Sequence, residues 1–207
     1  RQIRQNGITF YSYGSLVNTV PTRLIQNNTF REINAWGIYM LNSVTTYAII
    51  SVNDFVNPGA PSIYTKYGGI YIGEIKNPTT AKYLVNQNTM NRMVTGIKGE
   101  NLAQLTSNYN TIQLSPQNNI NSNLGFHLIN CQKPNLTRND VTGNTTASNI
   151  NIDQGMYVLD CPSGSYTCNK FKNTYVGSQF SGQNISTTLF ENTYDYNLAG
   201  IYLTKQG

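Results

Sequence analysis

The sequence predicts an all-β protein, namely a β-sandwich of the jelly-roll or Ig-like/pilin-like kind with long polar loops and at most one or two short helices. Three observations predict it. Short runs alternate apolar and polar residues with the period of a strand. The chain contains 30 Asn, a residue that is favoured in turns and depleted in strand centres. Charged residues make up 11%, against about 25% in an average domain, so neutral polar groups cover the surface.

The length predicts a single domain. An all-β chain of 207 residues normally forms one unit, so we expect one domain over 1–207 with an extended N-terminal arm over 1–20. Such an arm is able to complete a neighbour's sheet by strand addition. The first residue is Arg1 rather than Met, which predicts that the chain has been processed or trimmed.

The first half of the chain shows the strand period most clearly. In 7–14 (GITFYSYG) apolar and polar residues alternate, and in 36–40 (WGIYM) the pattern places Trp36 on the side opposite Tyr39. The segment 45–54 is almost continuously apolar, as in a strand covered on both faces. All three segments are predicted strands.

The strongest turn signal lies in 62–76, where two β-rich runs flank Gly68 and Gly69. A Gly-Gly pair supplies the positive φ angles of a two-residue turn, so this segment predicts a β-hairpin. Further strands are expected at 109–114, 125–131, 155–161, 173–180 and 187–204.

Helix is expected in two places at most. After Pro78, residues 79–94 fit one helix and 100–105 fit a single turn. The polar stretches 115–123 and 132–151 predict exposed loops with almost nothing to bury. No internal repeat at a solenoid or propeller period is evident.

Charge and hydropathy limit the partners. The net charge of +5 comes from scattered residues, so a nucleic-acid partner is expected only if a basic arm precedes Arg1. The most apolar region, 35–52, is interrupted by polar residues and predicts strands instead of a membrane span.

Catalytic and cofactor motifs are absent from the sequence. The chain has a single histidine, His127, and lacks a nucleophile elbow and both common phosphate-binding glycine loops. A zinc site would need His127 together with Cys131, Cys161 and Cys168. In a strand, His127 and Cys131 would lie roughly 13 Å apart at about 3.3 Å per residue, too far to share an ion. We therefore expect no metal, no cofactor and no enzyme.

The cysteines offer three alternatives. Cys161 and Cys168 flank the turn-forming residues 162–165, so a disulfide between these two is predicted. A bridge from Cys131 to Cys161 is the second alternative, and three reduced thiols are the third. Chain entropy gives about 2.5 kcal/mol for the first bridge and about 3.7 kcal/mol for the second, which does not choose between them.

Two sets of residues are candidates for contacts with other molecules. Four sequons, no more than chance gives in so Asn-rich a chain, are candidate glycosylation sites at Asn27, Asn135, Asn144 and Asn184. The candidate ligand or interface residues are aromatic: Tyr64, Tyr67, Tyr71 and Trp36. Half-buried strand aromatics with no ligand are the plainer interpretation of the second set.

Together these features favour a non-enzymatic structural subunit of a self-assembling surface structure. This would be an extracellular filament or fimbria, or a jelly-roll viral coat, and hence a homo-oligomer or polymer outside the cell, on its surface or in a virion. The alternative function is a carbohydrate-binding adhesin or receptor-binding domain. Its Tyr and Asn side chains, in loops such as 132–151, would contact a glycan or a host surface receptor.

Overall fold

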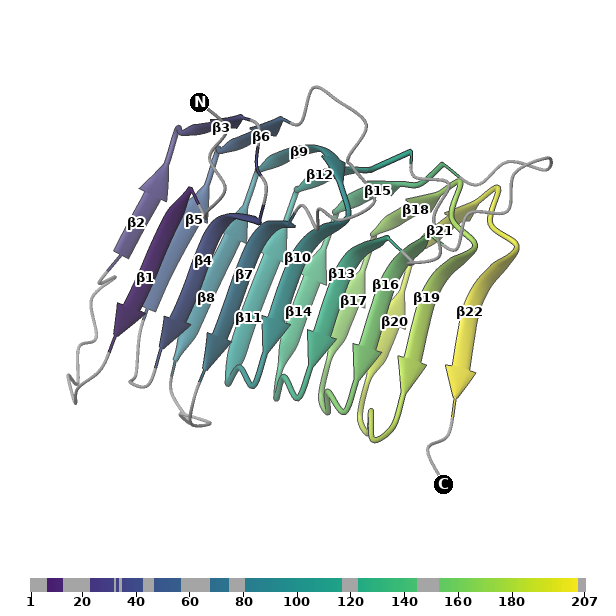
Figure 1. Cartoon of the computed structure of the whole chain (residues 1–207). Coiled ribbons are helices and arrows are strands. Elements are labelled where there is room, and N and C mark those ends of the chain that lie inside the picture. The colour runs from purple at the N-terminus through teal and green to yellow at the C-terminus, as the bar shows by residue number, and fades with distance from the viewer. Residues whose placement is uncertain are drawn as a thin grey trace.

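The protein folds as a parallel β-helix. The computed structural model describes residues 7–12, 23–31, 33, 35–42, 47–56, 68–74, 81–116, 123–144 and 153–204. Within these ranges the regular structure consists of strands alone, all paired in parallel and stacked in three sheets (Figure 1). The expected β-sandwich is therefore wrong, because jelly-roll and Ig-like sandwiches are built from antiparallel strands.

Sheet A, at the front of Figure 1, has eight strands. They are β1 (Ile8–Ser12), β4 (Trp36–Asn42), β7 (Gly68–Glu74), β10 (Thr95–Glu100), β13 (Leu124–Ile129), β16 (Gln154–Leu159), β19 (Val176–Ser181) and β22 (Ala199–Thr204). Sheet B lies behind it with seven: β2 (Arg23–Gln26), β5 (Tyr47–Ser51), β8 (Lys82–Asn86), β11 (Gln104–Asn108), β14 (Pro134–Thr137), β17 (Ser165–Thr167) and β20 (Thr188–Phe190).

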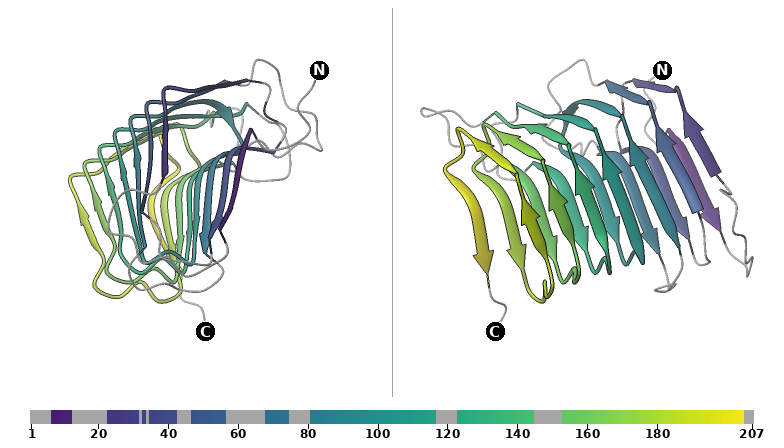
Figure 2. Two further views of the ribbon diagram at one scale, coloured as in Figure 1. Left: turned by 90° about the vertical axis from the view of Figure 1, so that its left-hand side faces the viewer. Right: turned by 180° about the vertical axis from the view of Figure 1, so that it is seen from behind.

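Sheet C closes the third side. Its strands are β3 (Thr29–Arg31), β6 (Asp54–Val56), β9 (Thr89–Met93), β12 (Thr111–Leu114), β15 (Asp140–Thr142), β18 (Lys170–Lys172) and β21 (Thr193–Asp195). The chain passes through sheets A, B and C in turn, and each circuit, here called a coil, stacks on the one before (Figure 2). The coils are numbered 1 to 8 from β1, and β22 alone represents coil 8.

A glycine in every coil lets sheets A and C meet closely. A Cβ atom on Gly96 would lie 2.6 Å from the carbonyl oxygen of Gly125 and 2.8 Å from the side chain of Ile112 in sheet C. At each of these glycines an added Cβ atom would meet the same two groups, the glycine of the next coil and an inward residue of sheet C. These glycines are Gly7, Gly37, Gly69, Gly96, Gly125, Gly155 and Gly177, and Gly200 continues the row in coil 8.

An asparagine ladder holds the turn between sheets B and C. Each ladder residue follows a residue with φ of 53 to 56°. In all of them except the last, Asn192, the backbone N–H and Nδ2 both donate to Oδ1 of the next ladder residue at 2.9 to 3.0 Å. Ladder partners are 22 to 35 residues apart in sequence. The ladder consists of Asn28, Asn53, Asn88, Asn110, Asn139, Asn169 and Asn192.

The core is a set of apolar columns that run along the stack. In sheet A, Ile38, Ile70 and Ile97 occupy one inward position of successive strands and are fully buried. In sheet C the inward column begins with Phe30 and Phe55, whose rings stack at 4.8 Å. It continues through Met90, Ile112, Val141, Phe171 and Tyr194.

Five further expectations are wrong. The segment 62–76 is not a hairpin, because β7 runs through Gly68 and Gly69. Residues 79–94 are not helical, since they contain β8 and β9, separated by Gln87 with φ of 54°. The turn at 100–105 is the passage from β10 to β11, and the loop 132–151 contains β14 and β15, whose inward side chains belong to the core.

The fifth error concerns the repeat, because the coils do form one. Its constant parts are a glycine at the start of each sheet A strand and Asn-x-apolar at the start of sheet C; an apolar residue follows the glycine in every coil except coil 7, where Ser178 follows Gly177. One local expectation also changes: Trp36 lies on the same, outer side as Tyr39, because the pairing register skips Gly37 and the strict alternation is lost there.

The two ends of the stack differ. In coil 1 the inward side chains of Ile25 and Phe30 are 4% and 9% exposed. In coil 8 the inward side chains of Ile201 and Leu203 are 48% and 72% exposed. A search of the described residues for a helix long and apolar enough to cross a membrane finds none.

Candidate functional site

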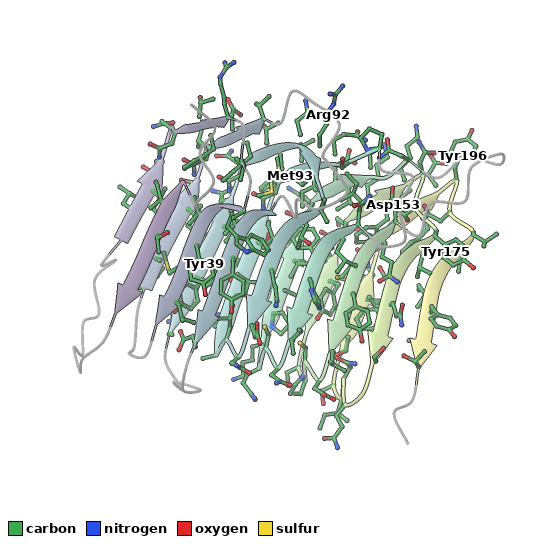
Figure 3. All side chains as sticks on the ribbon, in the orientation of Figure 1. Tyr39, Arg92, Met93, Asp153, Tyr175 and Tyr196 are labelled. Atoms are coloured by element: carbon green, nitrogen blue, oxygen red, sulfur yellow. The ribbon has the colours of Figure 1, made fainter. Side chains whose placement is uncertain are left out.

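The outer face of sheet A carries a row of aromatic and polar side chains, one from each coil. Parallel pairing in register places them about 4.8 Å apart along the stack. Tyr39 is labelled on this face in Figure 3. The row consists of Thr9, Tyr39, Tyr71, Lys98, His127, Tyr157, Gln179 and Tyr202.

An aromatic cluster forms the part of this row nearest coil 1. The rings of Tyr39 and Tyr71 stack at 4.7 Å between centroids, and the Trp36 ring lies 5.5 Å from that of Tyr71. Two glycines make room for the rings: the indole of Trp36 covers Gly68, and the phenol of Tyr71 covers Gly73. Any side chain at either glycine would displace the ring above it.

Next to the cluster lies a hydrogen-bonded ion pair. Lys98 Nζ is 3.1 Å from Glu100 Oε2, and the Tyr71 hydroxyl donates to the same oxygen at 3.1 Å. Lys98 also lies 5.3 Å from the centroid of the Tyr71 ring, within the range of a cation–π contact. Burial and the charge of Glu100 raise the pKa of Tyr71, so its hydroxyl stays a donor. Side chains of β7 and β10 are thereby held in one arrangement.

His127 follows Lys98 in the row. Its ring lies 5.5 Å from that of Tyr157, edge to face. Burial, and secondly the charge of Lys98, lower the pKa of His127 to about 4. The imidazole is therefore neutral at pH 7, with one nitrogen to donate and one to accept a hydrogen bond.

The chemistry of this face is suited to binding. Within the described part of the outer face, Glu100 is the only carboxylate, and it is engaged by Lys98 and Tyr71. Glycoside hydrolysis normally needs a pair of carboxyl groups about 5 to 9.5 Å apart. The acid that precedes Glu100 in the chain, Glu74, points inward, is 2% exposed and accepts a hydrogen bond from Tyr83.

The structure brings together two of the four predicted interface residues. Trp36 and Tyr71 meet in the aromatic cluster, while Tyr64 and Tyr67 lie outside the described residues. Tyr39, Lys98, Glu100, His127 and Tyr157 were not predicted as ligand contacts. A signal for four of them exists: each stands two residues after a glycine of the repeat, as in Gly37-Ile-Tyr39.

The cysteines are free thiols in the structure. The strand β17 lies between Cys161 and Cys168, and the cysteine that Cys161 contacts is Cys131, whose backbone N–H donates to Cys161 Sγ at 3.2 Å. Among the described residues no group of three or more His, Cys, Asp or Glu side chains is placed to hold a metal ion.

The four sequons differ in exposure. Asn27 and Asn135 are exposed, which leaves their amides accessible to glycosylation. Asn144 and Asn184 are half-buried, and each donates its Nδ2 to a backbone carbonyl, of Leu114 and Ser181 respectively.

The chain was compared with protein-family models, with curated proteins and with solved structures, and none of them matches it. No relative therefore supplies a residue role for this face. Its function has to be inferred from the side chains themselves and from their geometry.

Proposed function

We propose that the protein is a glycan-binding module, and that its ligand lies across the outer face of sheet A. The observation that carries this proposal is the row of side chains on that face, in which Tyr, Lys and His stand in register on adjacent strands. Strands fix these positions more firmly than loops do, so the surface is ready to bind without rearrangement.

The residue types match the chemistry of sugars. Aromatic rings offer an apolar body for the apolar face of a sugar ring, and the Tyr hydroxyls and the His127 nitrogens offer polar edges for its hydroxyl groups. Trp36 and Tyr71 provide the largest such platform, held over the two glycines. The ion pair of Lys98 and Glu100 adds a fixed donor and acceptor beside it.

Charge favours a neutral ligand. On the described part of the face, Lys98 and Glu100 neutralise each other and His127 carries no charge at pH 7. An anionic polysaccharide would meet no excess of positive charge there. We therefore propose a neutral glycan, which the protein binds without cleaving.

Affinity electrophoresis through gels containing neutral polysaccharides tests the proposal. We expect at least one of a panel of glucans, mannans, xylans and galactans to retard the protein. Tyr71→Ala and Tyr157→Ala should abolish the retardation, because each removes one ring of the row. Tyr196→Ala is the matched control, since Tyr196 is 76% exposed and belongs to the turn after sheet C.

Circular dichroism should show that all three variants keep the β-sheet spectrum of the parent protein. If no polysaccharide retards the parent protein, or if Tyr196→Ala weakens binding as much as Tyr71→Ala does, the outer face of sheet A is not a glycan site.

The self-assembling subunit expected from the composition stays a prediction, as do its extracellular, cell-surface or virion locations. A glycan-binding face and assembly are compatible in one protein, because sheet A uses its outer surface and leaves the outer faces of sheets B and C available for contacts.

A further inference from the structure

We propose that Cys131 and Cys161 form a disulfide that joins coils 5 and 6 when the protein meets an oxidising environment. The two residues occupy the same place in successive coils. Cys131 follows Asn130, which has φ of 53°, and Cys161 follows Asp160, which has φ of 52°. The strands before these turns, β13 and β16, are paired in register up to Ile129 and Leu159.

The backbone separation fits a disulfide. Neighbouring parallel strands lie about 4.8 Å apart, which is inside the range of roughly 4.4 to 6.8 Å that Cα atoms of bridged cysteines span. Cys161 Sγ already points to the neighbouring coil, 3.2 Å from the backbone nitrogen of Cys131. Cys131 Sγ lies 3.5 Å from the carbonyl oxygen of Ile129. Bond formation replaces this contact of Cys131 Sγ by a bond to Cys161 Sγ.

The surroundings assign a role to each thiol. Both side chains are 0% exposed, in the apolar core. The hydrogen bond with Cys131 lowers the pKa of Cys161, whereas burial raises the pKa of Cys131. The backbone N–H of Cys131 donates to Cys161 Sγ and so stabilises a thiolate at that sulfur. Because the thiolate is the reactive form, Cys161 is the attacking sulfur and Cys131 the resolving one.

The reaction balances with a small-molecule disulfide such as oxidised glutathione. The Cys161 thiolate attacks one glutathione sulfur, the S–S bond of glutathione breaks, and the first reduced glutathione leaves. Cys131 then loses its proton to solvent and attacks the Cys161 sulfur of the mixed disulfide, which releases the second reduced glutathione. The two cysteine thiols lose two electrons in total, and the glutathione disulfide takes up those electrons.

Cys168 serves as an internal control. It lies at the turn between sheets B and C, beyond β17, where its Sγ is 3.3 Å from Glu191 Oε2. It is only partly buried, so an oxidant in solvent reaches it without opening of the fold. Under the same conditions Cys168 should carry a mixed disulfide with glutathione.

The test is a peptide map of the whole chain after refolding in oxidised and reduced glutathione. Trypsin is expected to leave Cys131 in the peptide 99–138 and both Cys161 and Cys168 in the peptide 139–170, because Lys133 precedes a proline. A bridge between Cys131 and Cys161 joins the two peptides. A bridge between Cys161 and Cys168 closes a loop within one peptide.

We expect the two joined peptides, with a mass two hydrogens below their sum. Cys168→Ser should keep the link and Cys131→Ser should abolish it. Oxidation should raise the midpoint temperature of thermal unfolding by on the order of 5 to 10 °C, and reduction should return the midpoint to its original value. A loop within 139–170 would overturn the proposal. So would free thiols at Cys131 and Cys161 in a sample whose Cys168 carries glutathione.

Discussion

Asn110 shows what one buried amide does in this fold. Its backbone N–H and Nδ2 donate to Asn139 Oδ1, its Nδ2 also donates to the carbonyl of Val85, and its own Oδ1 accepts from Asn88. One side chain therefore satisfies polar groups in three coils. Since Asn110 is 1% exposed, water does not replace these partners.

Asn110→Ala should therefore lower the free energy of unfolding by at least about 2 kcal/mol, because an unpaired buried donor or acceptor costs about 1 to 3 kcal/mol. The measurement is a urea unfolding curve. Asn135→Ala is the matched control: Asn135 lies exposed on the outer side of β14, and surface substitutions change stability by about 0.5 kcal/mol or less. Equal losses in the two variants would contradict the ladder's role.

Glu74 predicts the pH dependence of stability. Burial raises the pKa of Glu74 to about 8, although the Tyr83 hydroxyl acts in the opposite sense. Between the ordinary pKa of 4.5 and 8, the folded protein keeps a proton that the unfolded chain has released, so stability falls as the pH rises. His127 has the opposite effect below its ordinary pKa of 6.5, because its pKa in the folded protein is about 4. Between pH 4 and 6.5 the unfolded chain binds a proton that the folded protein does not, so the contribution of His127 to stability rises with pH.

Of Glu74 and His127, only Glu74 contributes to this dependence between pH 6.5 and 8. We expect the free energy of unfolding to fall across this range, and Glu74→Gln to flatten the curve because Gln does not titrate. Urea unfolding at half-unit pH intervals measures both. A parent protein whose stability rises with pH between 6.5 and 8 would show that Glu74 is ionised in the folded state.

At the scale of elements, the close approach of sheets A and C depends on the glycine of each coil. A Cβ atom on Gly125 would overlap the carbonyl oxygen of Gly155 and lie 2.5 Å from the Val141 side chain. A backbone atom cannot move aside as a flexible side chain can. Gly200, in the last coil, has no atom closer than 3.4 Å to the same position.

Gly125→Ala should therefore lower the free energy of unfolding by roughly 2 kcal/mol or more, as overpacking a core does. Gly200→Ala should change the midpoint of chemical denaturation little. Chemical denaturation of the two variants side by side measures the difference. Similar midpoints would mean that sheets A and C are farther apart than the structure places them.

Strand positions were partly predictable from the sequence, and strand direction was not. The predicted strands at 125–131 and 155–161 coincide with β13 and β16, because alternation reports which faces are buried. The same alternation occurs in antiparallel sheets, so it does not tell a sandwich from a β-helix. Trp36 shows a local limit as well, since Gly37 interrupts the alternation beside it.

The repeat escaped prediction for a physical reason. Only the glycine and the ladder asparagine are constrained in each coil, and the turns between them vary in length, so ladder residues recur at intervals from 22 to 35 residues. The ladder also uses seven of 30 asparagines. The ladder asparagines therefore do not stand out from asparagines in ordinary turns. The row on the outer face of sheet A takes one residue from each coil, so it cannot be recognised in the sequence before the strand register is known.

For the whole molecule, the stack predicts how the chain tolerates deletions. Removal of 125–154 takes out one full coil, after which Gly155 follows Gly96 in the glycine row and Asn169 follows Asn110 in the ladder. Removal of 125–139 takes out β13 and β14 and leaves two strands of sheet C in succession. In a solenoid each coil contacts only its neighbours, so the full-coil deletion should fold and the half-coil deletion should not.

Circular dichroism and small-angle X-ray scattering measure this. The full-coil deletion should keep the β-sheet spectrum and give a particle about 4.8 Å shorter. If the half-coil deletion unfolded as cooperatively as the full-coil deletion, the three-sheet coil would not be the folding unit.

A glycan bound across the outer face of sheet A, as proposed above, would lie beside Trp36, the chain's single tryptophan, which stands on that face. The most direct measurement is Trp36 fluorescence during titration with the neutral polysaccharide that retards the protein most. We predict a saturable change in emission, absent in Tyr71→Ala and kept in Tyr196→Ala. A polysaccharide that binds while Trp36 emission stays unchanged, or binding that survives Tyr71→Ala, would contradict the proposal.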